Sequence, residues 1–209
     1  MFEIIPIGFD CGTASELRDN GIRNASYPFD WNVTFGGISD IFNNDFQNFL
    51  NIENNYNYIY NIFFMHDTFP NDNEKYERRI ERLRDILASD KEILFIRKSH
   101  SYHNHKEILG RIQDDSINDI NDIIKFDNFI KNKYPLLKYK ILFIAICSNC
   151  YLNTILNNSE NIFYINISKK YDNDMNDLII DFDKFKDIMK NVCISKNLDE
   201  FKKLFNNFN

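Results

Sequence analysis

A cysteine near the N-terminus, Cys11, stands where the sequence most favours nucleophilic chemistry. An apolar run, 4–9, precedes it, and Thr13-Ala14-Ser15-Glu16 after it fits the capping box that opens a helix. Cys11 is therefore predicted at a strand-to-helix turn, near the positive end of a helix dipole. Thiols in such positions have a lowered pKa and act as nucleophiles. The alternative is a small apolar residue that closes a buried strand.

The turn around Cys11 could supply further parts of a catalytic site. Backbone N–H groups of Gly12 and Thr13 would stabilise a negatively charged carbonyl oxygen in the transition state. Asp10 would oppose thiolate formation if its carboxylate lay close to the sulfur, so we expect it to bond the turn instead. The spacing Gly8-x-x-x-Gly12 matches neither a P-loop nor a dinucleotide loop.

A cysteine nucleophile needs a base within hydrogen-bond reach and a group that orients the base. The chain offers four histidines: His66, His100, His103 and His105. We favour His66 as the base, because it follows the apolar run 58–65. If that run is a strand parallel to the first, His66 and Cys11 both lie at carboxyl ends of strands, where open α/β sheets bind ligands. The alternative is a histidine that ends a strand, bonded to Asp67 or to backbone.

The segment 28–31, Pro-Phe-Asp-Trp, places an acid between two aromatic residues. Asp30 could orient a histidine or contact a substrate beside Trp31, and Asp67 is a second candidate for the orienting carboxylate. The alternative for Asp30 is a turn in which Phe29 and Trp31 anchor the loop and the carboxylate caps the backbone.

Three arginines, Arg79, Arg82 and Arg97, could bind phosphate or carboxylate groups bidentately, or could form internal ion pairs. Segment 99–105, with His100 and His103, follows a predicted strand and would lie on the same rim. We expect it to be a polar loop that could supply a base in place of His66. Its spacing matches no metal-ligand pattern, so no metal and no cofactor are predicted.

Apolar runs alternate with amphipathic stretches along the whole chain, which favours a single α/β domain over residues 1–209. The expected arrangement is a three-layer, mainly parallel sheet with helices on both faces, which is Rossmann-like. The last residues, 206–209, are expected to be frayed. Strands are predicted at 3–9, 58–65, 92–97, 139–146 and 161–168, and helices at 13–20, 38–50, 73–88, 116–133, 181–191 and 198–206.

Composition narrows the classes of partner. The net charge of −6 disfavours sequence-independent nucleic-acid binding, which needs clustered Lys and Arg. No apolar run approaches the roughly 20 residues of a membrane span, and no signal peptide is evident, so a cytoplasmic location is expected. The high content of Asn, Ile, Lys and Phe indicates an AT-rich genome, as in many large DNA viruses, low-GC bacteria and some protists. If the protein is viral, we expect it in the host cytoplasm or in the virion.

Several blocks of the sequence together resemble a known family. They are I-G-F-D-C, L-R-D-N-G-I-R and S-Y-P-F-D-W, followed by His66-Asp67, residues 76–82 and residues 93–97. This series is similar to a domain family of bacteria and large DNA viruses whose members are described as papain-like cysteine peptidases. The resemblance covers the first half to two thirds of the chain and implies that Cys11 is a nucleophile. Papain-like enzymes pair a helical lobe with an antiparallel barrel, so we take the fold from the periodicity instead.

Three functional hypotheses follow from these observations. The first is a cysteine-dependent hydrolase that acts on a peptide or small-molecule substrate, with Cys11 as nucleophile, His66 as base and Asp30 as orienting acid. The second is a binding or transferase module for an anionic small molecule, such as a nucleotide sugar or sugar phosphate, held by the arginines. The third is a viral interaction protein without catalytic turnover.

Overall fold

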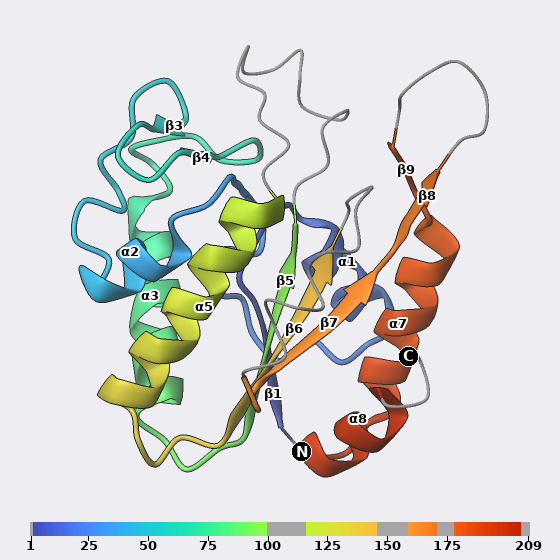
Figure 1. The fold of residues 1–209 in the computed structure, drawn as a ribbon. Coiled ribbons are helices and arrows are strands. Elements are labelled where there is room, and N and C mark those ends of the chain that lie inside the picture. Colours follow the sequence, from blue (N-terminus) through green and yellow to red (C-terminus); the bar gives the residue numbers. More distant parts are fainter. Residues whose placement is uncertain (1, 100–115, 146–158, 171–177, 206–209) are drawn as a thin grey trace.

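A four-stranded parallel sheet forms the centre of the computed structural model, which describes residues 2–99, 116–145, 159–170 and 178–205 (Figure 1). The strand order is β1–β5–β6–β7, and each neighbouring pair is parallel. The bounds are β1 (Glu3–Pro6), β5 (Ile93–Lys98), β6 (Tyr139–Ala145) and β7 (Ile162–Asn166). The predicted parallel sheet is confirmed, and all strands point their carboxyl ends to the same edge.

Helices cover both faces of this sheet, which gives the three layers expected from the sequence (Figure 1). One face carries α2 (Ile38–Asn43), α3 (Asn73–Leu87) and α5 (Ser116–Lys133). The other carries α1 (Gly12–Asp19), α7 (Phe182–Ile194) and α8 (Leu198–Phe205). Among the described residues, no helix has the length and apolar character needed to cross a membrane.

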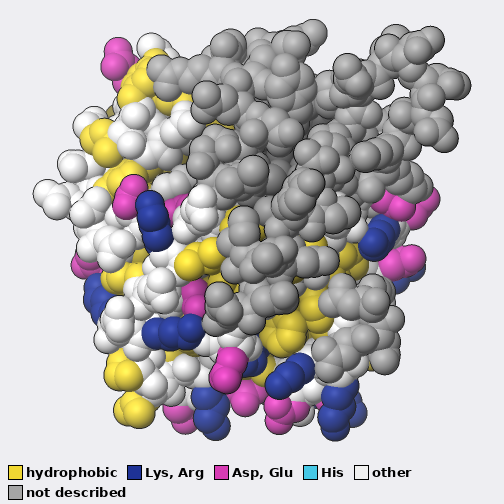
Figure 2. All heavy atoms as spheres, in the orientation of Figure 1, with side chains coloured by type: hydrophobic (Ala, Val, Ile, Leu, Met, Phe, Trp, Pro, Cys, Tyr) yellow, Lys and Arg dark blue, Asp and Glu magenta, His cyan; other side chains and the backbone are white. Residues whose placement is uncertain are grey.

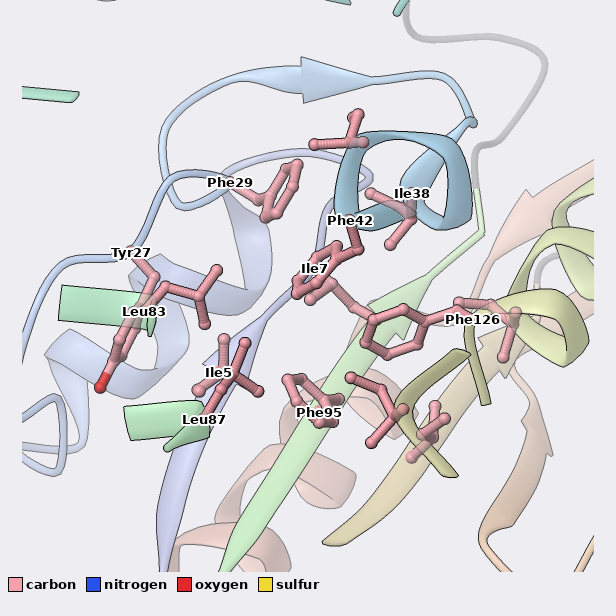
Figure 3. Close-up of a cluster of buried hydrophobic side chains, with 14 of the residues drawn as sticks. Ile5, Ile7, Tyr27, Phe29, Ile38, Phe42, Leu83, Leu87, Phe95 and Phe126 are labelled. Carbon is pink, nitrogen blue, oxygen red and sulfur yellow. The ribbon is translucent and has the colours of Figure 1, made fainter. Parts of the chain in front are cut away.

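Two hydrophobic cores follow from the alternation of side chains along the strands. In β5, Ile93 and Phe95 face the core beneath α2, α3 and α5, whereas Leu94 and Ile96 face the core beneath α1, α7 and α8. Figure 3 shows the first core, where Phe95 lies near Phe126 of α5. Both faces of the central strands are therefore buried, which explains their unbroken apolar sequences.

The predicted strand at 58–65 is wrong in its partner and its length. This region forms part of a separate antiparallel sheet of three two-residue strands, β2 (Val33–Thr34), β4 (Ile62–Phe63) and β3 (Tyr56–Asn57). Tyr58 and Ile59 lie between β3 and β4 and are 61% and 53% exposed. A second small pair, β8 (Ser168–Lys170) with β9 (Leu178–Ile180), was also not expected.

The helix predicted at 38–50 ends at Asn43, because Asp45, Phe46 and Asn48 adopt left-handed backbone angles that break it. Its N-terminus is stabilised from another helix. The Asp122 carboxylate of α5 accepts hydrogen bonds from the Ile38 and Ser39 N–H groups at 2.7 and 3.1 Å. This replaces a local capping side chain.

Charge is mixed on the face shown in Figure 2, where basic and acidic side chains are interspersed over the lower half.

Candidate functional site

Cys11 lies at the start of α1 and just beyond the carboxyl end of β1. Its carbonyl accepts the Ser15 N–H at 2.8 Å, the first hydrogen bond of the helix, and its side chain is partly exposed. The predicted cap at Thr13 is wrong, because Thr13 is inside the first turn and fully buried, and its hydroxyl has no partner among the described residues. The predicted position of the thiol at a helix N-terminus is confirmed.

An ion pair between Asp10 and Lys98 lies next to the thiol. Lys98 Nζ is 2.7 Å from Asp10 Oδ2, and the other carboxylate oxygen accepts the Gly12 N–H at 2.8 Å. Asp10 therefore bonds the turn, as expected. Lys98 was missed in the sequence, although it is the last residue of the strand that pairs with β1, which is the signal that could have found it.

Gly12 leaves room for this ion pair. A Cβ atom at Gly12 would lie 2.9 Å from Asp10 Oδ1 and 3.0 Å from Lys98 Nζ, so both charged groups occupy the space of its missing side chain. The Gly12 N–H is already donated to Asp10, so the expectation that it stabilises a carbonyl oxygen is wrong for this conformation. The same role for the Thr13 N–H stays a prediction.

The pKa of the Cys11 thiol is raised above its ordinary value. Burial is the main cause, and the charge of Asp10 acts in the same direction. A backbone hydrogen bond and the charges of Lys98 and Arg18 lower the pKa but do not outweigh burial. The thiol is therefore protonated at neutral pH, and the expected lowering by the helix dipole does not prevail.

Arg97 is enclosed by protein groups, so it does not have the open position that binding a ligand would need. Its side chain is 0% exposed and pairs with Asp119 of α5 through contacts of 2.7 and 3.0 Å. It also donates to the carbonyls of Ile7 and Thr34, both at 3.0 Å. A Cβ at Gly8 would lie 2.2 Å from Arg97 Nη1, so Gly8 makes this packing possible. The alternative of internal ion pairing holds for Arg97.

Asp30 is also fully buried, in the turn that follows Tyr27. Its Oδ2 accepts the Tyr27 N–H at 3.0 Å and pairs with Arg23, so the carboxylate caps the backbone as the alternative reading proposed. Its Oδ1 has no partner among the described residues. Burial raises the pKa of Asp30 above its usual range, although Arg23 and the charge of Arg79 oppose this. Arg23 was missed in the sequence.

Trp31 connects this turn to His66. The rings of Trp31 and His66 meet edge to face with centroids 6.3 Å apart, and His66 is exposed. The guanidinium groups of Arg18 and Arg23 lie 5.4 and 5.0 Å from the centre of the Trp31 ring. The charge of Arg18 also acts on the thiol of Cys11, so Arg18 is near both the Trp31 ring and the thiol.

Asp67 is bonded away from His66. Its Oδ2 accepts the Tyr76 hydroxyl at 2.6 Å, and its Oδ1 pairs with Lys75. Burial, together with the hydrogen bond to Asp67, raises the pKa of the Tyr76 hydroxyl above its usual range. Asp67 thus ties the segment after β4 to the start of α3, and an orienting role toward His66 would need a rearrangement.

Arg79 and Arg82 project from α3 toward the segment that contains Asp30. Arg82 Nη1 donates to the Ser26 carbonyl at 2.6 Å. Arg79 lies with its Cζ 4.8 Å from the centre of the Tyr76 ring, and its buried Nη1 has no partner among the described residues. The structure therefore separates these two residues from Arg97, whose partner is on α5.

His100 and His103 lie outside the described residues, as does the alternative base at His105. Within the described part of the chain, no group of three or more His, Cys, Asp or Glu side chains could hold a metal ion. The candidate site therefore consists of Cys11, its neighbouring ion pair, and Trp31 with the side chains that contact its ring.

Comparison with known families adds one finding. Residues 2–58 match the model of a family described as "Putative papain-like cysteine peptidase". No curated protein and no solved structure matches the chain. The match contains Cys11, Arg23, Asp30 and Trp31 but ends before His66, so it is shorter than the resemblance expected from the sequence. The N-terminal part of the chain is thus similar to this papain-like cysteine peptidase family.

Proposed function

We propose that the protein is a cysteine-dependent hydrolase of peptide, amide or ester bonds, with Cys11 as the nucleophile. The observation that carries the proposal is the partly exposed thiol at the start of α1, beside the Asp10–Lys98 pair. The match of residues 2–58 to a family described as cysteine peptidases supports the same assignment.

In the proposed reaction, a base takes the proton from Cys11 Sγ while the sulfur forms a bond to the carbonyl carbon. The carbonyl π electrons move to the oxygen, and the nearby ammonium group of Lys98 offsets this negative charge. The electrons then return, the bond to the leaving group breaks, and the leaving group accepts the proton from the base. Water hydrolyses the resulting thioester by the same steps and restores the thiol.

The base has to act during the attack rather than before it, because burial keeps the pKa of the Cys11 thiol raised at rest. His66 remains our candidate, since it contacts Trp31 and is exposed. Asp30 is proposed as a positioning residue, because it holds Arg23 against the Trp31 ring. A histidine of segment 100–105 is the second candidate for the base.

Two cysteines of the described chain allow a controlled test. Cys193 of α7 is also free and partly exposed, but burial and the charge of Glu16 raise the pKa of its thiol to about 11. We would treat the intact protein with a peptide that carries an acyloxymethyl ketone and locate the adduct by mass spectrometry. We expect modification of Cys11 with Cys193 unchanged, and slower modification in His66→Ala.

Equal modification of both cysteines would contradict the proposal, because it would mean that exposure alone determines the reaction. Hydrolysis of a peptide library by the Cys11→Ala variant at the rate of the unchanged protein would also contradict it. The Cys193→Ala variant is the matched control and is expected to keep full reactivity at Cys11.

A further inference from the structure

A surface cavity of about 290 Å³ lies beside the C-terminal end of α1. Its lining residues carry two guanidinium groups, one hydroxyl and one carboxamide, but no carboxylate: Arg18, Gly21, Arg23, Asn24, Ala25 and Ser26. All six belong to the segment that matches the cysteine peptidase family. The cavity therefore has the volume for a small polar group, and two guanidinium groups form part of its wall.

The two arginines of this cavity are held in place by different contacts. Arg23 donates to Ser26 Oγ at 2.8 Å, pairs with the buried Asp30, and keeps a buried Nε without a partner among the described residues. Arg18 bonds Asp19 at 2.9 Å and Ser15 Oγ at 3.1 Å. Both guanidinium groups lie against the Trp31 ring, which restricts their hydration on that side.

We infer that this cavity binds the anionic group of a small molecule, either a carboxylate or a phosphate, through Arg18 and Arg23. Guanidinium groups recognise both anions through paired hydrogen bonds. The binding step stands without catalysis, but the further step, that this anion belongs to the hydrolase substrate, rests on the proposed function.

The position of Arg18 on α1 sets the length of such a substrate. Arg18 and Cys11 are seven residues apart, which corresponds to about 10 Å along a helix. The side chain of Arg18 extends back to Ser15, and its charge acts on Cys11. The inferred substrate is thus a short acidic peptide or another acyl compound whose negative charge lies within about 10 Å of the bond that is broken.

Thermal unfolding of the full chain with Cys11→Ala tests the binding step without turnover. The probes are inorganic phosphate and succinate, each compared with sodium chloride at the same ionic strength. A ligand that binds only the folded state raises Tm, by about 3–5 °C at a concentration tenfold above its Kd. A rise with either probe supports the site and identifies the preferred anion.

Arg18→Gln is the decisive variant, because Arg18 is exposed and its loss leaves Asp30 paired with Arg23. Arg78→Gln on α3 is the matched control, an exposed arginine with one carboxylate neighbour, Glu74. We expect Arg18→Gln to lose the rise in Tm and Arg78→Gln to keep it. Equal rises in the two variants, or no rise above that of chloride, would overturn the inference. Anion binding without any hydrolysis would refute only the proposed function.

Discussion

Arg97 and Lys98 are neighbours on β5, yet their side chains enter opposite layers and form very different ion pairs. Arg97 and Asp119 are both 0% exposed, and the guanidinium also bonds the carbonyls of Ile7 and Thr34. The Lys98 and Asp10 side chains are 7% and 20% exposed and lie beside Gly12 and the thiol. An arginine whose donors all bond to protein acceptors holds secondary-structure elements together. A cation beside a thiol can instead change the pKa and the reactivity of that thiol.

The largest effect is expected from Arg97→Met. This change leaves the Asp119 carboxylate buried without its cation, and two backbone carbonyls lose a donor. Loss of one partner of a buried ion pair costs about 3–5 kcal/mol in the free energy of unfolding. Urea unfolding followed by circular dichroism measures it.

The double variant Arg97→Met/Asp119→Leu sharpens this prediction, because it removes both charges. We expect it to be more stable than Arg97→Met alone, since the buried charge of Asp119 is removed together with that of Arg97. If the double variant is less stable than the single one, the Arg97–Asp119 pair is not the main contribution of Arg97.

Lys98→Met is expected to lower the free energy of unfolding by only about 1 kcal/mol, because Asp10 keeps its hydrogen bond to the Gly12 N–H and some contact with solvent. Its main effect should be on Cys11. Removal of a nearby positive charge raises the pKa of the thiol further, so alkylation at pH 8 should slow about three- to tenfold.

Lys98→Arg is the control that keeps the charge, and its alkylation rate should stay close to that of the unchanged protein. The measurement is the rate of iodoacetamide modification at Cys11, with Cys193 as the internal reference. A similar slowing at both cysteines would show that Lys98 acts through general stability and not through its charge.

Asp10→Asn should change the same rate in the opposite direction. The carboxylate raises the pKa of the Cys11 thiol, and Asn keeps an oxygen that can accept the Gly12 N–H. We expect alkylation of Cys11 at pH 8 to become about threefold faster. Slower alkylation in both Asp10→Asn and Lys98→Met would mean that the integrity of the pair, and not the sign of each charge, controls the thiol.

The last prediction concerns the pH dependence of stability that the other thiol, Cys193, provides. The pKa of Cys193 is about 11 in the folded protein, whereas an unfolded thiol ionises near ~8.5. Between these values the unfolded chain binds fewer protons, so the stabilisation is fully present below pH ~8.5 and is lost as pH rises toward about 11. The Tm of Cys193→Ala should therefore fall less between pH 8.5 and 10 than the Tm of the unchanged protein. Equal slopes of Tm against pH in the two proteins would refute this.

Periodicity predicts the three layers well because both faces of the sheet are buried. The expected strand at 92–97 and helix at 73–88 agree closely with β5 and α3. It fails at 58–65, which is as apolar as the central strands but leaves Tyr58 and Ile59 exposed. The local sequence shows how apolar a segment is. It does not show which sheet the segment joins, because that depends on strands far away in the chain.

The position of Cys11 was predicted from the sequence, but the electrostatics around it were not. Cys11 lies at the predicted helix N-terminus, yet the sign of its pKa change depends on burial and on Asp10 and Lys98, which tertiary structure brings together. Asp30 was singled out by its aromatic neighbours, but its partner Arg23 comes from the irregular segment that follows α1. No local pattern reveals such pairings.

The pairing of β1 with β5 also has a consequence for how the chain acquires its structure. Glu3 pairs with Ile93, so the first strand has its hydrogen-bonding partner only after roughly 90 further residues have been made, and closing so long a loop is slow. A peptide limited to residues 2–58 lacks β5 and Arg97, and we expect it to stay unfolded. On the ribosome, the thiol of Cys11 would therefore emerge long before its charged neighbour Lys98 arrives.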